Sequence, residues 1–144
     1  MLLFQPRPRP APSLRQPDRI QRAKVVPFYR SLSPQERAVT QWLLDHADPK
    51  ATHFIHQLDV VLVTGLCDCG CPTISLLVPH ETPGAFSRRN LIATAIGIVD
   101  GRWVSLMLMQ SEGYLTCLNV HSLDSIERPY GLPRLDSLRP YWRL

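Results

Sequence analysis

Two short turns between apolar segments constrain the fold of this chain more than any other feature of its sequence. The dipeptide Asp100-Gly101 supplies the positive φ angles that a two-residue β-hairpin requires, and Glu112-Gly113 is a similar turn signal. These dipeptides separate three segments rich in residues typical of strands: residues 92–99, 103–109 and 114–121. We therefore predict three consecutive strands that form an antiparallel meander.

Two further strands are predicted earlier in the chain. Residues 60–66 form a β-branched and aliphatic run, and apolar side chains alternate with hydroxyl side chains over residues 73–78. A short connection that contains three cysteines joins these two segments. The predicted sheet therefore has roughly five strands and is mainly antiparallel.

A helix signal precedes these strands. Ser33 is a good N-cap, Pro34 suits the first helical position, and Glu36 completes the pattern of a capping box. The helix is expected to end near Asp48, because the proline that follows disfavours helical backbone at that residue. Apolar residues at helical spacing over residues 50–58 predict a second, short helix. The predicted fold class is α+β, with an N-terminal helix or helix pair followed by the sheet.

The first 30 residues differ in composition from the rest of the chain. They contain six prolines, seven basic residues and one aspartate, which gives a net charge of +6. Because the whole chain carries +4, residues 31–144 carry −2. A segment of this composition buries too little apolar surface to offset the entropy lost on ordering. We therefore expect a disordered Pro/Arg-rich tail over residues 1–30 and a single α+β domain over residues 31–144.

Length and composition restrict the class of protein further. A chain of 144 residues suffices for one hydrophobic core, and it contains no apolar run long enough to cross a bilayer as a helix. Prolines at every second position from Pro6 to Pro12 interrupt the N-terminal apolar residues, so we expect no secretory signal and a cytoplasmic location. In a reducing cytosol, cysteines are expected to be thiols or metal ligands.

The most distinctive motif runs Cys-Asp-Cys-Gly-Cys-Pro-Thr over residues 67–73, and we name it the cysteine turn. Its thiols, Cys67, Cys69 and Cys71, occupy alternate positions, which can place them on a common side of an extended chain. The glycine between the last two lets the backbone form a tight turn. Thiolates are the ligands that zinc and other soft ions prefer.

A closed structural zinc site needs a fourth ligand. Cys117 and His121 are candidates because they lie four residues apart on one face of the last predicted strand, and His80 follows the second predicted strand. The spacing of the cysteine turn differs from the paired Cys-x-x-Cys of common zinc sites. A turn of small reduced cysteines without a cofactor is therefore the first interpretation, and zinc binding and redox chemistry are the alternatives.

Other chemistry-bearing residues give weaker patterns. His53 and His56 are spaced so that they could meet one metal ion on the second predicted helix, although surface histidines are the simpler interpretation. Arg88 and Arg89 could bind a phosphate, although a solvated loop is the simpler interpretation. The sequence contains no Gly-rich phosphate loop and no nucleophile elbow. These observations argue against an enzyme.

The order of three motifs resembles a family of small, uncharacterised bacterial proteins. The motifs are Ser-Pro-Gln-Glu-Arg at residues 33–37, the cysteine turn, and Gly-Tyr-Leu at residues 113–115. The resemblance covers roughly residues 31–123. It implies a bacterial domain of unknown function, and it carries no activity, cofactor or partner that can be transferred to this chain.

Two functions from different classes are predicted. The first is a small non-catalytic interaction domain, of accessory or immunity type, whose partner is another protein; a mildly acidic domain without a catalytic set favours it. The alternative is a thiol-based site on the cysteine turn that binds metal or performs redox chemistry. A membrane partner is not expected, and nucleic acid is expected to bind only weakly, through the basic tail.

Overall fold

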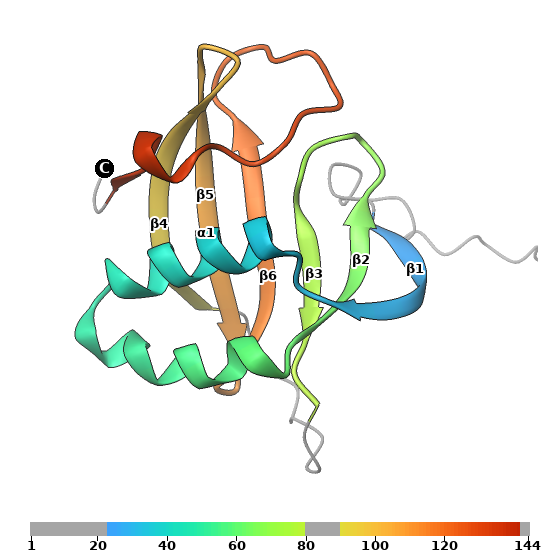
Figure 1. The fold of residues 1–144 in the computed structure, drawn as a ribbon, viewed down its shortest axis with the longest axis vertical. Helices are drawn as coiled ribbons and strands as arrows, with labels where there is room; N and C mark the ends of the chain where they lie inside the picture. Colours follow the sequence, from blue (N-terminus) through green and yellow to red (C-terminus); the bar gives the residue numbers. More distant parts are fainter. Residues whose placement is uncertain (1–22, 80–89, 142–144) are drawn as a thin grey trace, which may run out of the picture.

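The computed structural model describes residues 23–79 and 90–141, and it shows one antiparallel sheet with two helices packed against it (Figure 1). Within those residues the sheet has seven strands in the order β1-β2-β3-β6-β5-β4-β7. The strands are β1 Ala23–Ser31, β2 Leu62–Cys67, β3 Ile74–Leu77, β4 Asn90–Val99, β5 Arg102–Ser111, β6 Tyr114–Ser122 and β7 Arg139–Pro140. The helical elements are α1 Pro34–Asp45 and the 3₁₀ helices η3 Pro49–Asp59 and η4 Leu135–Ser137. The predicted α+β class is confirmed.

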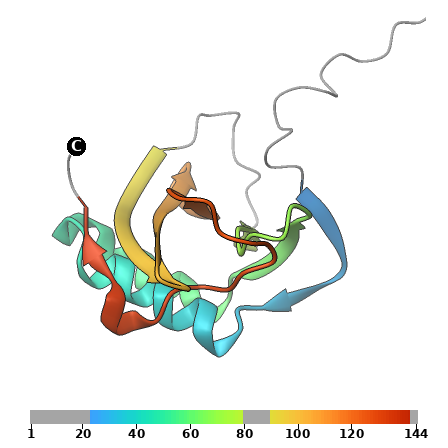
Figure 2. The ribbon, with the colours of Figure 1, turned by 90° about the horizontal axis from the view of Figure 1, so that it is seen from above.

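The sheet is curved, and the helices lie against one side of it. Figure 2, seen from above, shows the strands arranged in an arc with α1 across its open side. Val39 and Leu43 of α1 belong to the same hydrophobic core as Leu106 and Leu108 of β5. Alternate side chains of a strand point to opposite faces, so one face of β5 supplies the core while the other faces away from the helices. The core therefore lies between the sheet and the helices.

The predicted meander is confirmed, and so are its turns. β4 pairs antiparallel with β5, and β5 pairs antiparallel with β6. Asp100 has a φ of 51° and Gly101 a φ of 76°, which are the two positive angles expected of a tight hairpin. Glu112 and Gly113 follow the same pattern, with φ of 55° and 87°.

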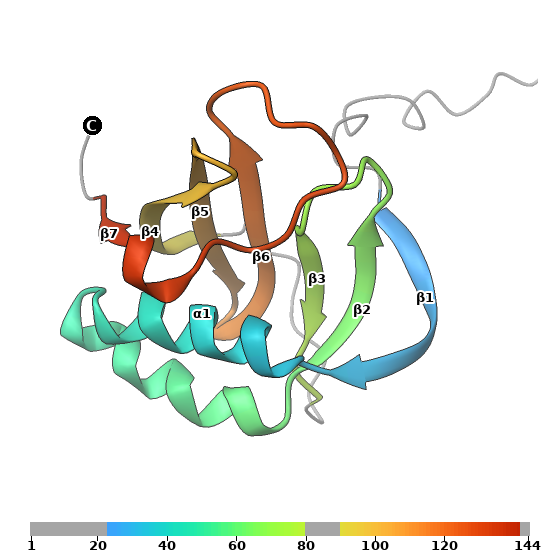
Figure 3. The same ribbon diagram turned by 45° about the horizontal axis from the view of Figure 1, so that its top comes forward.

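The strand count corrects the prediction of roughly five strands. The two additional strands, β1 and β7, form the opposite edges of the sheet (Figure 3). Each contains a proline, at Pro27 and Pro140, and a residue without an N–H group is tolerated in a sheet mainly at its edges. The sequence signal for a strand was weak at both places for the same reason. Residues 1–22 lie outside the described residues.

Strand β1 also changes the expected boundary of the domain. It covers residues 23–30, which we expected to belong to the disordered tail, and it pairs antiparallel with β2. The backbone of this segment obtains hydrogen-bond partners from β2, which composition alone does not reveal. The sheet therefore includes residues 23–30, which the prediction had placed outside the domain.

The second predicted helix is present, with a different geometry. Residues 50–58 were expected to form a short helix, and η3 covers them as a 3₁₀ helix. Asp48 caps it, because its carboxylate accepts a hydrogen bond of 2.9 Å from the backbone N–H of Lys50. Among the described residues, no helix combines the length and the apolar character needed to cross a membrane.

The start of α1 has the capping box that the sequence predicts. The backbone N–H of Glu36 donates to the Ser33 hydroxyl at 3.1 Å, and the backbone N–H of Ser33 donates to the Glu36 carboxylate at 2.8 Å. Arg30, from β1, donates to both carboxylate oxygens of Glu36 at 2.8 and 3.1 Å. Burial opposes ionisation of Glu36, but the bonds from Arg30 and Ser33 outweigh it and lower the pKa of the carboxyl group. The capping box thus also ties β1 to α1.

We expect Ser33→Ala to lower the free energy of unfolding by about 1 kcal/mol, because the N–H of Glu36 loses its acceptor. Denaturant titration followed by circular dichroism measures the change. Ser33→Thr keeps the acceptor oxygen and is the matched control, which should lose less than half as much. Equal losses in the two variants would show that the hydroxyl acceptor is not what stabilises this helix.

The chain after β6 returns across the molecule. Tyr130 and Leu138 are buried in the core, and Leu132 packs against it. This segment therefore packs across the domain. Tyr141 is an exception, because it is 36% exposed, and Trp142 lies outside the described residues.

Candidate functional site

The cysteine turn connects the end of β2 to the start of β3, at the end of the sheet from which the chain also leaves β6 (Figure 1). Two backbone hydrogen bonds close it: the N–H of Cys67 donates to the carbonyl of Thr73 at 3.3 Å, and that of Gly70 donates to the carbonyl of Cys67 at 3.5 Å. Gly70 has a φ of +99°, a conformation that side chains with a Cβ rarely adopt. The glycine therefore allows the chain to reverse between Cys69 and Cys71.

This reversal brings the three thiols of the turn together. The Sγ atoms of Cys67, Cys69 and Cys71 all lie within 4.8 Å of one another. The Sγ atoms of Cys67 and Cys69 are 3.1 Å apart, and the backbone N–H of Cys71 donates to the Sγ of Cys69 at 3.3 Å. All three residues are partly buried, and they are thiols rather than disulfides. Three soft ligand atoms thus converge on one point.

The acidities of the first two thiols are shifted in opposite directions. Burial and the hydrogen bond with Cys69 raise the pKa of Cys67 to about 12. For Cys69, burial opposes ionisation, but hydrogen bonds from Cys67, from Cys71 and from the Cys71 backbone, with the positive charge of Arg128, lower the pKa. The turn therefore stabilises a thiolate at Cys69 by making its neighbours donors.

Residues 128–130, in the segment after β6, pack over the cysteine turn, and we name them the clamp. The backbone N–H of Tyr130 donates to the carbonyl of Gly70 at 3.0 Å. A Cβ atom on Gly70 would lie 3.1 Å from the Cβ of Arg128 and 3.2 Å from the Cα of Pro129. Burial and the neighbouring Cys71 raise the pKa of Tyr130. The close approach of residues 128 and 129 therefore requires a glycine at position 70, and so does the positive φ angle.

Thr73 anchors the other end of the turn. Its hydroxyl accepts a hydrogen bond of 2.8 Å from the backbone N–H of Val120 and donates one of 3.1 Å to the carbonyl of Val120. The thiol of Cys71 donates to the same hydroxyl at 3.4 Å. Thr73 is one of the two buried polar residues among those the structure describes. The turn is therefore fixed to β6 through a fully used hydroxyl group.

Two of the three residues proposed as a fourth metal ligand, Cys117 and His121, do not join this cluster. Cys117 is buried on β6, where it pairs with Ser75 of β3 and Met109 of β5. His121 pairs with Ser105 of β5. Within the described residues the clustered ligand atoms are the three thiols of the turn alone. The third candidate, His80, lies outside the described residues.

The sequence did not identify the residues of the clamp. Arg128 and Tyr130 are distant from the cysteine turn along the chain, and neither carries a motif that relates it to the thiols. The place where this segment packs depends on the path of the chain after β6.

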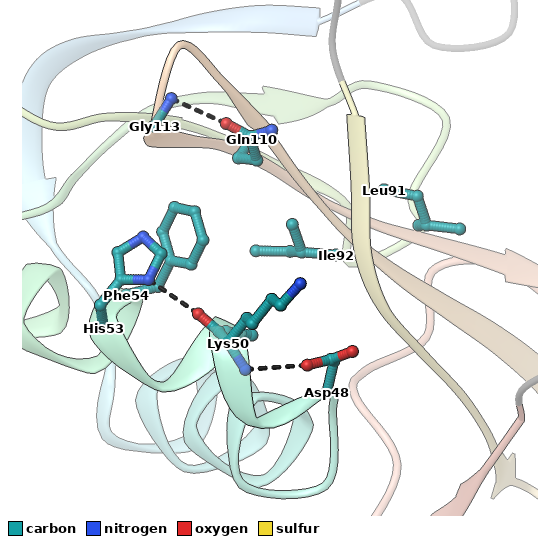
Figure 4. Close-up of a pocket in the computed structure, with 9 residues that line it drawn as sticks. Asp48, Lys50, His53, Phe54, Leu91, Ile92, Gln110 and Gly113 are labelled. Atoms are coloured by element: carbon teal, nitrogen blue, oxygen red, sulfur yellow. Dashed lines mark hydrogen bonds between the residues drawn. The ribbon is translucent and has the colours of Figure 1, made fainter.

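A pocket of about 420 Å³ lies between η3 and the sheet. It is lined by Phe54 and Ile92 and, among polar residues, by His53 and Lys50 (Figure 4). The Nδ1 atom of His53 lies 2.8 Å from the carbonyl of Lys50. His56 is not among the residues that line this pocket. Arg88 and Arg89 lie outside the described residues.

The fold and the site together define a small α+β domain with a three-thiol turn at one end of a curved antiparallel sheet. Comparison of the chain with models of protein families, with curated proteins and with solved structures found no match in any of the three. The resemblance to a family of bacterial proteins therefore stays a prediction.

Proposed function

We propose that this domain binds one soft metal ion through Cys67, Cys69 and Cys71. The observation that carries the proposal is the convergence of three Sγ atoms within 4.8 Å of one another. Thiolates select zinc, copper(I) and iron–sulfur chemistry, and zinc is the first ion to test. This proposal replaces the first interpretation of the sequence, a turn of small reduced cysteines without a cofactor. The sequence pattern alone left the direction of the thiols open.

The spacing of the sulfur atoms supports the proposal. A Zn–S distance of about 2.3 Å at tetrahedral angles places two sulfur atoms about 3.8 Å apart. The Sγ atoms of Cys67 and Cys69 are 3.1 Å apart, and no pair in the cluster exceeds 4.8 Å. Side-chain rotations that move each sulfur atom by less than about 1 Å therefore suffice for coordination.

The surroundings also support an anionic thiolate centre. Three thiolates around a divalent ion leave a net charge of −1, and the guanidinium group of Arg128 acts electrostatically on Cys69. Tyr130 and Pro129 cover Gly70 and hold the turn in place. The three thiolates leave one position of a tetrahedral ion for water or an external ligand.

We expect the wild-type protein, purified without chelator, to contain about one equivalent of zinc, measured by elemental analysis. Cys69→Ser should abolish stoichiometric binding, because the thiolate at the centre of the cluster is lost. Cys117→Ser is the matched control, since Cys117 lies outside the cluster, and it should keep the metal. Cobalt titration of the wild type and both variants, read from thiolate-to-metal charge-transfer absorption, detects the site in protein that lost zinc during purification. Absence of metal and of the cobalt signal in the wild type would refute the proposal.

The hypothesis of a small interaction domain has its own supporting observation. Ile98 and Trp103 form a cross-strand pair at the β4–β5 turn, and the N–H of Leu123 donates to the carbonyl of Trp103. Each of these three large apolar side chains is more than one third exposed. Clusters of exposed apolar residues are typical of surfaces that bind proteins. This function is compatible with metal binding, because none of these three residues belongs to the group of three thiols.

A further inference from the structure

The closest contact between thiols in the cysteine turn has the geometry that precedes a covalent bond. The Sγ atoms of Cys67 and Cys69 are 3.1 Å apart, while a disulfide bond is about 2.05 Å long. An approach of about 1 Å therefore joins them. Residues two apart in a chain with trans peptide bonds have Cα atoms at most about 7 Å apart, close to the range that disulfides span.

The third thiol of the turn is engaged differently. The Sγ of Cys71 donates to the Thr73 hydroxyl at 3.4 Å, and this hydroxyl is fixed to β6 through its two bonds with Val120. Cys117, the remaining cysteine, is buried on β6 and lies outside the cluster. The geometry thus selects Cys67 and Cys69 as the pair.

We propose that Cys67 and Cys69 form a reversible disulfide by exchange with a low-molecular-weight disulfide such as oxidised glutathione. One thiolate of the pair attacks a sulfur atom of the small disulfide, forms a mixed disulfide and releases one thiolate. The second thiol gives its proton to solvent, and its sulfur attacks the protein sulfur of the mixed disulfide. The Cys67–Cys69 bond forms and a second small thiolate leaves. The pair loses two electrons, and the small disulfide gains them.

This redox step uses two of the three proposed metal ligands, but it stands on the Cys67–Cys69 contact and holds whether or not the domain binds metal. Where metal is bound, the two states exclude each other, because a disulfide sulfur is no longer a thiolate ligand. Metal then protects the pair from oxidation. Oxidation releases the metal.

The test treats the full-length wild-type protein with oxidised glutathione, both as purified and after removal of metal by a chelator. Thiols are then counted under denaturing conditions, and the bond is located by peptide mapping. We expect a loss of two of the four thiols per chain, with a Cys67–Cys69 link and no retained glutathione. Added zinc should slow the loss. A persistent glutathione adduct, a link that involves Cys71, or no loss of thiols in the chelator-treated wild type would overturn the proposal.

Variants separate this proposal from the metal site. Cys71→Ser removes a proposed metal ligand but not a member of the pair, so it should lose metal binding and still form the Cys67–Cys69 disulfide. Cys67→Ser should accumulate a stable mixed disulfide with glutathione at Cys69. A Cys71→Ser protein that forms no disulfide contradicts the redox proposal, while one that keeps stoichiometric metal contradicts the three-thiolate metal site. Mapping of the wild type gives an answer even if a variant fails to fold.

Discussion

Gly70→Ala is expected to lower the free energy of unfolding by about 2 to 3 kcal/mol, although it adds a single methyl group. The φ of +99° at this position is strained for any residue with a Cβ. The added carbon would also lie 3.2 Å from the Cα of Pro129, a backbone atom that cannot rotate away. Relief of this contact separates the clamp from the cysteine turn and breaks the bond from Tyr130 to the Gly70 carbonyl. Chemical denaturation measures the loss, and zinc or cobalt affinity should fall with it.

Gly113→Ala is the matched control for this prediction. Gly113 has a φ of +87°, so alanine there meets a similar backbone cost, but nothing lies within 4 Å of the position of its Cβ. We expect it to lose about 1 kcal/mol and to bind metal as the wild type does. Equal destabilisation by the two substitutions would show that the close approach of residues 128–129 contributes nothing. In that case the clamp would not determine the geometry of the thiols.

Leu118→Ala is expected to have the largest effect of any single substitution considered, about 3 to 5 kcal/mol. The side chain of Leu118 is fully buried, and the residue pairs with Ile74 of β3 and Leu108 of β5. It therefore lies where β1, β2 and β3 join the β4–β6 meander. A cavity here removes apolar contacts from both parts of the sheet at once.

The matched control for this cavity is Leu77→Ala. Leu77 lies on β3, but its side chain is 42% exposed, so its truncation should cost less than about 1 kcal/mol. Thermal and denaturant unfolding of both variants measures the difference. Similar losses in the two variants would contradict the position of Leu118 at the centre of the core. Such a result would also place the β3–β6 junction in doubt.

The elements predicted with most success are those whose signals are local. The capping box of α1 and the two hairpin turns depend on residues within a few positions of one another, and both are present as expected. The alternation of β3 likewise places Ile74 and Leu76 in the core. β1 was missed because its strand character comes from pairing with β2, a distant segment, while its own composition favours disorder.

The candidate site was likewise predicted where its signal is local and missed where it depends on distant segments. The alternate spacing of Cys67, Cys69 and Cys71 allowed a common direction for their thiols without requiring it, and the structure brings them together. The expectation for Cys117 and His121 rested on the strand pattern of β6 and on no information about which strand lies beside it. In the sheet, β6 pairs with β3 and β5, and neither residue joins the group of three thiols.

The sequence by itself determined the α+β class, the start of α1, the meander and the position of the cysteine turn, because hydrogen bonds and φ preferences among near neighbours specify these features. Only the tertiary structure decided the strand order, the pairing of β1 and β7 at the edges, and the packing of Arg128, Pro129 and Tyr130 over Gly70. These contacts join residues far apart in the chain. They depend on how the core packs as a whole, so no short segment of sequence encodes them.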